Sequence, residues 1–225
     1  VRRQRQMCIR DSVQYAVPAI IAMTASSLYN MVDSIFIGHG VGALAISGLA
    51  LTFPLMNLAA AFGSLVGVGA ATLVSMRLGQ RDYETAQRIL GNVVVLNLII
   101  GISFGLLTLV FLDPILYFFG ASDATIGYAR EYMSVILWGN VVTHMYLGLN
   151  AVLRAAGHPR KAMYATILTV TINAILDPLF IFGFGWGIRG AAIATVLAQI
   201  LALVWQFRIF SDRNELLHFR RGIYR

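Results

Sequence analysis

The sequence predicts an all-α integral membrane protein, built as a bundle of six transmembrane helices. Of its 225 residues, 58% are hydrophobic and 12% are charged, whereas a typical soluble domain has roughly 45–50% apolar and about 25% charged residues. Six apolar runs follow one another along the chain, and each has at least the roughly 20 residues that a helix needs to cross a bilayer. We therefore expect lipid to be the solvent for most of this chain.

The six predicted helices follow from the positions of these runs. Short polar or glycine-containing stretches separate the runs and mark the ends of each helix. The second run is the longest, and Pro54 within it removes a backbone donor, which favours a kink. The predicted helices cover approximately residues 13–38, 44–76, 89–112, 131–152, 163–183 and 189–210.

Three further segments lie outside these helices. The opening stretch VRRQRQMCIRDS is polar and begins with Val, so residues 1–12 are expected to be a disordered or foreign leader. Residues 113–130 are expected to hold a short helix before the fourth span. The polar and basic segment 211–225 is expected to be a cytoplasmic connector to a missing second part of the protein.

The basic residues predict the orientation of the bundle. All but two of the 17 Lys and Arg residues lie before the first helix, at or after the end of the sixth, or in the loops that join helices 2 to 3 and 4 to 5; the two others are Arg130 and Arg189. Because Lys and Arg are retained on the cytoplasmic side, both ends of this segment are expected to be cytoplasmic. The net charge of +7 is thus interpreted as a topology signal and not as a nucleic-acid-binding surface.

Two acidic residues fall inside the predicted helices, and both require an explanation. Asp33 lies toward the outer end of the first helix, and Asp177 lies in the outer half of the fifth. An intramembrane carboxylate is costly, so it usually faces the interior of a bundle and is paired, protonated or bound to a cation. Two facing aspartates would form a proton or Na+ site; the alternative is a pair of purely structural buried carboxyl groups.

Polar neighbours at helical spacing favour the cation site. Residues four positions apart lie on one helix face, which puts Tyr29 beside Asp33 and Asn173 beside Asp177, while Thr195 follows Ala191 by four on the sixth helix. Three helices would thus bring a phenol, two carboxyls, an amide and a hydroxyl together, and hard cations prefer oxygen ligands. Pro18 interrupts the hydrogen bonding of the first helix and is interpreted either as a hinge or as a static kink.

The residues around these positions resemble a known family of transporters, the multidrug and toxic compound extrusion (MATE) family. The resemblance runs from about Val17 to Phe210 and rests on four motifs in the family's order and spacing. They are YNMVDSIFIGHGVGALAISGLA, RLGQRDYETAQR, GLNAVLRAAGHPRKAM and INAILDPLFIFGFGWGIRGAAIAT. Residues 1–12 resemble nothing in the family.

The resemblance implies an architecture and assigns roles to particular residues. Family members have two six-helix lobes, so this chain would be the first lobe of a twelve-helix protein, with the second lobe of the same polypeptide as its partner. The implied cation-binding set, polar network and proline hinge are Asp33, Asn173, Asp177, Thr195 and the backbone of Ala191 for the cation, Tyr29 and Asn150 for the network, and Pro18 for the hinge.

The implied activity is antiport in the cytoplasmic membrane of a prokaryote. An inward gradient of Na+ or H+ would drive the export of small organic, often cationic or amphipathic, drug-like compounds, with membrane lipid as the surroundings and no cofactor beyond the coupling ion. One alternative is a flippase for lipid-linked oligosaccharides, which would need basic residues in the helix cores, where this chain has none. A second is a membrane-embedded enzyme, but the chain has no HExxH or GxSxG motif, and its single cysteine, Cys8, excludes a disulfide framework.

Overall fold

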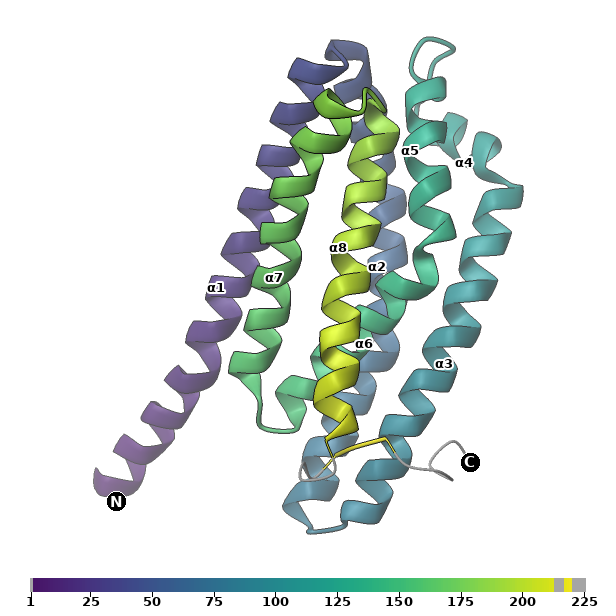
Figure 1. The fold of residues 1–225 in the computed structure, drawn as a ribbon. Helices are drawn as coiled ribbons and strands as arrows, with labels where there is room; N and C mark the ends of the chain where they lie inside the picture. The colour runs from purple at the N-terminus through teal and green to yellow at the C-terminus, as the bar shows by residue number, and fades with distance from the viewer. Residues whose placement is uncertain (1, 213–216, 220–225) are drawn as a thin grey trace.

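A computed structural model describes residues 2–212 and 217–219, and nearly all of this part is helical (Figure 1). The remainder of the predicted connector, residues 213–216 and 220–225, lies outside the described residues. The elements are α1 Arg2–Gly40, α2 Ala43–Gly79, α3 Tyr83–Val110, α4 Leu112–Phe118, α5 Ile126–Trp138, α6 Asn140–Ala155, α7 Pro159–Pro178, the π-helical turn η1 Leu179–Gly183, and α8 Ile188–Ser211.

The predicted fold class is confirmed. Within the described residues, five helices are long and apolar enough to cross a membrane, and the α5–α6 pair provides a sixth span. Large apolar side chains cover the outside of the bundle: Leu107, Val110 and Ile175 are 63%, 74% and 65% exposed. Such a surface is unfavourable in water and suits contact with lipid acyl chains.

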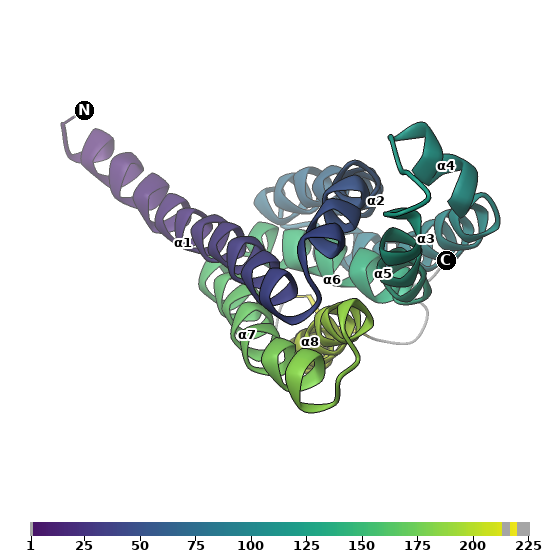
Figure 2. The same ribbon diagram turned by 90° about the horizontal axis from the view of Figure 1, so that it is seen from above.

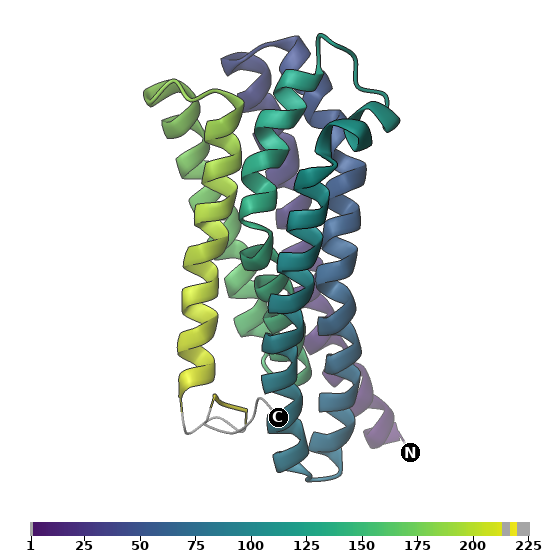
Figure 3. The same ribbon diagram turned by 90° about the vertical axis from the view of Figure 1, so that its right-hand side faces the viewer.

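The helices form two groups when the bundle is viewed from above (Figure 2). Helices α1, α7 and α8 pack together, and α2, α3 and α6 form the other group, with α5 against both α2 and α8. The start of α1 and the end of α8 lie at one end of the bundle, while α4 lies at the opposite end (Figure 3). This is the arrangement expected for an even number of spans.

Residues 2–12, which were expected to be a disordered or foreign leader, are helical, so they are not disordered; their foreign origin stays a prediction. Residues 2–12 are exposed, and they extend α1 outward as its first turns. Once a long apolar helix has formed, each further residue adds one hydrogen bond without a new nucleation cost, and Arg, Gln and Met are good helix formers. The polar composition of this segment therefore predicted its exposure but not its conformation.

The predicted fourth helix, residues 131–152, is also corrected. It begins earlier, at Ile126, and is divided into α5 and α6, which meet at an angle of 58°. Gly139 lies at the break and packs against Val196 of α8, while the Asn140 amide donates to the Gly101 carbonyl of α3 at 2.9 Å. The bend thus depends on contacts with neighbouring helices, so it could not be predicted from the sequence of residues 131–152 alone.

The contact between Gly139 and Val196 gives a testable prediction. A Cβ atom at position 139 would lie 2.7 Å from Val196 Cγ2, closer than real Cβ atoms approach other atoms. Gly139→Ala is therefore expected to lower the free energy of unfolding by roughly 1–3 kcal/mol through overpacking. Thermal unfolding in detergent measures the loss. In a Val196→Ala background the same substitution should cost little, and an equal cost in both backgrounds would contradict the contact as its cause.

Glycines also allow α2 and α6 to approach closely. A Cβ atom added to Gly67 would lie 2.7 Å from the Cα atom of Gly148, and one added to Gly63 would lie 3.1 Å from the ring of His144. These two α2 glycines lie one turn apart on one face, which α6 covers. Helices α2 and α6 thus form the centre of the bundle and support the helices that carry the candidate site.

Candidate cation-binding site

The structure brings together the two intramembrane aspartates. Asp33 comes from α1 and Asp177 from the last turn of α7, and the two side chains lie within hydrogen-bonding contact. Asp33 is 4% exposed and Asp177 is fully buried, so neither side chain faces lipid. Helix α8 completes the surroundings of the pair, because it packs against both α1 and α7.

A carboxyl–carboxyl contact has a direct chemical consequence. Two ionised carboxylates repel each other strongly where water is excluded, so the pair must share a proton or hold a cation. In the described part of the chain, Asp33 Oδ1 is buried and has no hydrogen-bond partner. A buried oxygen without a donor is the feature expected where a proton or a positive ion binds.

A chain of polar side chains continues from Asp177 to the other two helices. The Tyr29 hydroxyl of α1 lies 3.0 Å from Thr195 Oγ1 of α8, and Thr195 Oγ1 lies 2.9 Å from the amide of Asn173 on α7. The Asn173 amide fits best with its nitrogen toward Asp177, where it donates to Oδ2 at 2.7 Å, and with its oxygen toward Thr195 and Tyr29. We refer to Tyr29, Asp33, Asn173, Asp177 and Thr195 as the carboxyl cluster.

Ala191 enters this cluster through its backbone. The Thr195 hydroxyl lies 3.0 Å from the Ala191 carbonyl oxygen, one turn earlier in α8, and donates to it. Ala191 is fully buried, which keeps this carbonyl away from water and lipid. The structure thus unites all five residues of the predicted cation-binding set in a single group with Tyr29.

A π-helical turn directly follows Asp177. Pro178 has no backbone N–H, and α7 ends there and continues as η1. A Cβ atom added to Gly190 would lie 2.9 Å from the backbone of Phe180 in η1, so the start of α8 approaches this turn closely. Single π turns are frequent at functional sites. Here the turn holds the ends of α7 and α8 together beside the aspartates.

One further residue belongs with the carboxyl cluster and was missed in the sequence. Tyr132 of α5 is 2% exposed, its hydroxyl faces Thr195, and it interacts electrostatically with both aspartates. Tyr132 lies in the predicted fourth span, but periodicity gives no reason to separate it from the other aromatic residues there. Its role depends on the packing of α5 against α8, which is a tertiary feature.

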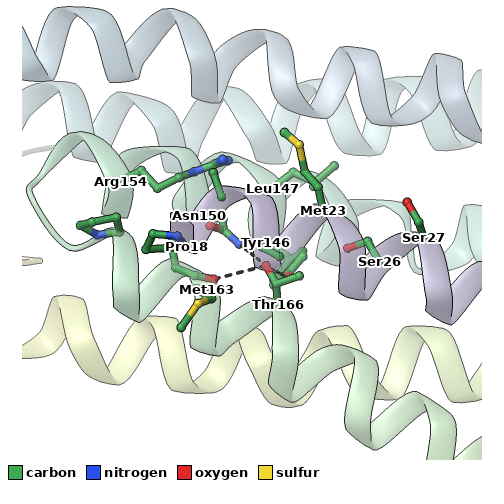
Figure 4. A pocket seen from close by; sticks show the side chains of 14 residues that line it. Pro18, Met23, Ser26, Ser27, Tyr146, Leu147, Asn150, Arg154, Met163 and Thr166 are labelled. Atoms are coloured by element: carbon green, nitrogen blue, oxygen red, sulfur yellow. Dashed lines mark hydrogen bonds between the residues drawn. The ribbon is translucent and has the colours of Figure 1, made fainter. Parts of the chain in front are cut away.

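The predicted network residue Asn150 and the predicted hinge Pro18 lie elsewhere. The Asn150 amide donates to Thr166 Oγ1 at 3.3 Å, and the Tyr146 hydroxyl also contacts Thr166, at 3.4 Å. Both Asn150 and Pro18 line a pocket of about 500 Å³ between α1, α6 and α7 (Figure 4). Helix α1 passes through Pro18 without a break. Among the described residues, no hydrogen bond joins the Asn150 side chain to the carboxyl cluster. The network role of Asn150 and the hinge role of Pro18 stay predictions.

The residues present fit a proton or a small hard cation. Asp33, Asp177, Asn173 and Thr195 supply carboxyl, amide and hydroxyl oxygens, and the Ala191 carbonyl lies next to them. Oxygen ligands of this kind suit Na+. A proton shared by the two carboxyls would satisfy the same geometry.

Comparison with known proteins shows the family to which the chain is related. The family model named MatE matches residues 18–179, which is more than half of the chain. The chain belongs to the MatE family. It is also 31% identical over 207 residues to the multidrug export protein MepA of Staphylococcus haemolyticus (strain JCSC1435), a match that covers 92% of this chain and 46% of that protein.

Solved structures of the family confirm the fold. A crystal structure of MATE in the bent conformation superimposes with a TM-score of 0.86 and 29% identity, covering 94% of this chain and 49% of that one. A crystal structure of MATE in the straight conformation gives a TM-score of 0.85 and 29% identity, covering 94% of this chain and 47% of that one. The chain thus spans about half the length of the relatives it matches, and the likeness to the bent and straight forms is nearly equal.

Proposed function

We propose that this MatE chain is one lobe of a cation-coupled transporter that exports organic, often cationic or amphipathic, compounds. The observation that carries the proposal is the buried contact between Asp33 and Asp177, together with the partnerless oxygen of Asp33. Such a pair takes up a proton or Na+ and releases it when the surroundings change. The name of the staphylococcal relative, a multidrug export protein, supports the class of substrate.

Antiport requires that cation binding and drug binding favour different conformations. A ligand shifts an equilibrium only through a difference in its affinity for the two states. The aspartates join α1 to α7, so binding a cation between them would favour the conformation in which these helices are in contact. Pro18 lies on α1, four turns from Asp33, and is the proposed bend point. A second lobe would complete the cavity in which the exported compound alternates between the two sides.

The two alternatives are less well supported. A flippase for lipid-linked oligosaccharides needs cationic side chains inside the bundle to bind a pyrophosphate, but the buried polar residues of the described chain include no Lys or Arg. A membrane-embedded enzyme would not explain the family membership. We further propose that both ends of this segment face the cytoplasm of a prokaryotic cell, as the basic residues indicate.

Drug efflux by reconstituted vesicles tests the proposal. The transporter that contains this lobe would be reconstituted, and efflux of ethidium would be followed by fluorescence under an imposed Na+ gradient or an imposed pH gradient. The Asp33→Asn/Asp177→Asn variant is expected to lose ion-driven efflux down to the level of vesicles without protein. The reason is that an amide pair neither takes up a proton nor balances the charge of Na+.

A matched control separates this effect from a general loss of charge. Asp123 is an exposed acid near α4, where it accepts a hydrogen bond from Tyr117 at 3.1 Å. Asp123→Asn should leave efflux unchanged under both gradients. Efflux by the double variant at the wild-type rate would show that the carboxyl cluster is not the coupling site.

A further inference from the structure

An open groove lies between α1 and the rest of the bundle. Toward its N-terminal end α1 diverges from the other helices (Figures 1 and 2). The resulting pocket of about 500 Å³ is lined by α1, α6 and α7 (Figure 4). Small and flexible apolar side chains form most of its wall, among them Ala19, Ala22, Met23, Ala162 and Met163. The groove therefore presents a largely apolar surface at the side of the bundle.

Arg154 places a positive charge in this groove. It lies in the last turn of α6 and lines the pocket next to Asn150 (Figure 4). It also lines a second hollow of about 320 Å³ between α2 and α6, where Thr72 and Ser75 are its polar neighbours. Arg154 thus lies between two hollows, both of which are lined by hydroxyl groups, and the larger one also by the Asn150 amide.

The charge of Arg154 is not balanced by a carboxylate in the described chain. Four other arginines have such a partner: Arg77 with Asp82, Arg88 with Glu84, Arg130 with Asp113, and Arg189 with Glu131. The side chain of Arg154 forms no ion pair or hydrogen bond with any residue that the structure describes. No acidic residue lines the two hollows as described. The guanidinium of Arg154 is therefore available to bind a negatively charged group in the groove.

The surroundings of Arg154 correspond to the level of lipid headgroups. The α6–α7 turn follows Arg154 directly, and α7 begins at Pro159. Pro159 also lines an adjoining pocket of about 470 Å³ that contains Arg160 and Lys161. Basic residues at the end of a membrane span lie near the phosphate groups of the bilayer. Positive charge thus surrounds one end of the groove, apolar side chains such as Met23 and Leu147 line its middle, and Ser26 and Ser27 lie at the other end (Figure 4).

We propose that this groove binds an anionic phospholipid, with its phosphate on Arg154 and an acyl chain along α1. The planar guanidinium forms two parallel hydrogen bonds with a phosphate. The apolar wall formed by Ala22, Met23 and Leu147 then covers the first part of the lipid's acyl chain. A soluble anion would satisfy Arg154 alone and leave this wall without a partner. The site is distinct from the carboxyl cluster, although its lining includes Pro18, the proposed bend point of α1.

Native mass spectrometry of the purified transporter that contains this lobe tests this inference directly. The protein in detergent would be titrated with dioleoyl phosphatidylglycerol, and bound lipid would be counted. Arg154→Gln is expected to weaken binding about tenfold, since a hydrogen bond to a charged group typically contributes on the order of one factor of ten. Arg208→Gln is the matched control, because Arg208 is exposed in the last turn of α8 at the same end of the bundle. The Arg208→Gln variant should bind the lipid with the affinity of wild type.

Further variants distinguish the phosphate contact from the acyl-chain contact. Ala22→Trp should weaken lipid binding without altering the charge, because the ring would fill the groove. Arg154→Lys keeps the charge but loses the planar fork, and an intermediate loss is expected. This variant also provides a measurement if Arg154→Gln does not fold.

Three results would overturn the proposal. One is equal affinity of wild type, Arg154→Gln and Arg154→Lys for phosphatidylglycerol. Another is equally tight binding of zwitterionic dioleoyl phosphatidylcholine. The third is displacement of the lipid by glycerol 3-phosphate at equal concentration, which would identify a site for a small soluble anion.

Discussion

A lobe that carries both Asp33→Asn and Asp177→Asn is expected to stay folded and to lose all stabilisation by the coupling cation. A ligand that binds only the folded state stabilises it by about 2.7 kcal/mol at a concentration of about 100 times its Kd. In the wild-type chain this stabilisation would arise at the contact between the two carboxyls. The amides of the variant have no charge to neutralise, so the stabilisation should fall to zero.

The folded state of the variant should be no less stable in the absence of cation. Both aspartates are buried and in contact, so removing their charges removes a repulsion as well as a desolvation cost. An amide at each position still offers donors and acceptors to Asn173 and Tyr132. The same double substitution thus separates a role in ion binding from a role in folding.

Thermal unfolding in detergent measures both effects. Wild type, the double variant and Asp123→Asn would be compared in NaCl and in choline chloride of equal ionic strength, and then over a series of pH values. A rise in melting temperature with NaCl alone identifies Na+ as the ion, and a rise only on acidification identifies H+. If the melting temperature of the double variant rises with either ion as much as that of wild type, the carboxyl cluster is not the cation-binding site.

Gly67→Ala is expected to cause the largest loss of stability among single glycine substitutions in α2. The added Cβ atom would lie 2.7 Å from the Cα atom of Gly148 and 3.2 Å from the side chain of Ala151. The first contact is with backbone, which cannot rotate away, so α2 and α6 must separate. Overpacking typically costs about 1–3 kcal/mol, which exceeds the gain of up to about 1 kcal/mol from replacing a helical glycine by alanine.

Gly69→Ala is the matched control for this prediction. Gly69 lies in the same helix, two residues further on, and nothing lies within 4 Å of the Cβ atom it would gain. Gly69→Ala should therefore leave the stability unchanged or raise it. Denaturation with sodium dodecyl sulfate, followed by circular dichroism, compares the two variants. Equal midpoints would show that close packing of α2 on α6 does not limit the stability of the bundle.

Much of the membrane fold could be predicted because its main determinant is local. A run of about 20 apolar residues crosses a bilayer whatever its neighbours are, since every backbone polar group must be bonded within the helix. The same reasoning selected Asp33 and Asp177, because a carboxyl inside an apolar run is costly unless it has a partner. Helical spacing then indicated Tyr29 and Asn173, both of which the structure places beside the aspartates.

Predictions failed where the outcome depends on contacts between helices. The division of the fourth span at Gly139 follows from the packing of Val196 and from the hydrogen bond of Asn140 to α3. Tyr132 joins the carboxyl cluster because α5 packs on α8, while the Asn150 amide donates to Thr166. None of these contacts can be predicted from the hydrophobic periodicity of a single helix.

The amino-acid sequence thus established the membrane environment, the approximate spans and the two carboxyls that need a positive partner. These properties follow from transfer free energies, which add up residue by residue along the chain. The three-dimensional arrangement settled which side chains meet: Asp33 with Asp177, Gly67 with Gly148, and Arg154 with an open groove. These contacts depend on how helices far apart in the chain pack against one another, because protein interiors are close-packed and leave few voids.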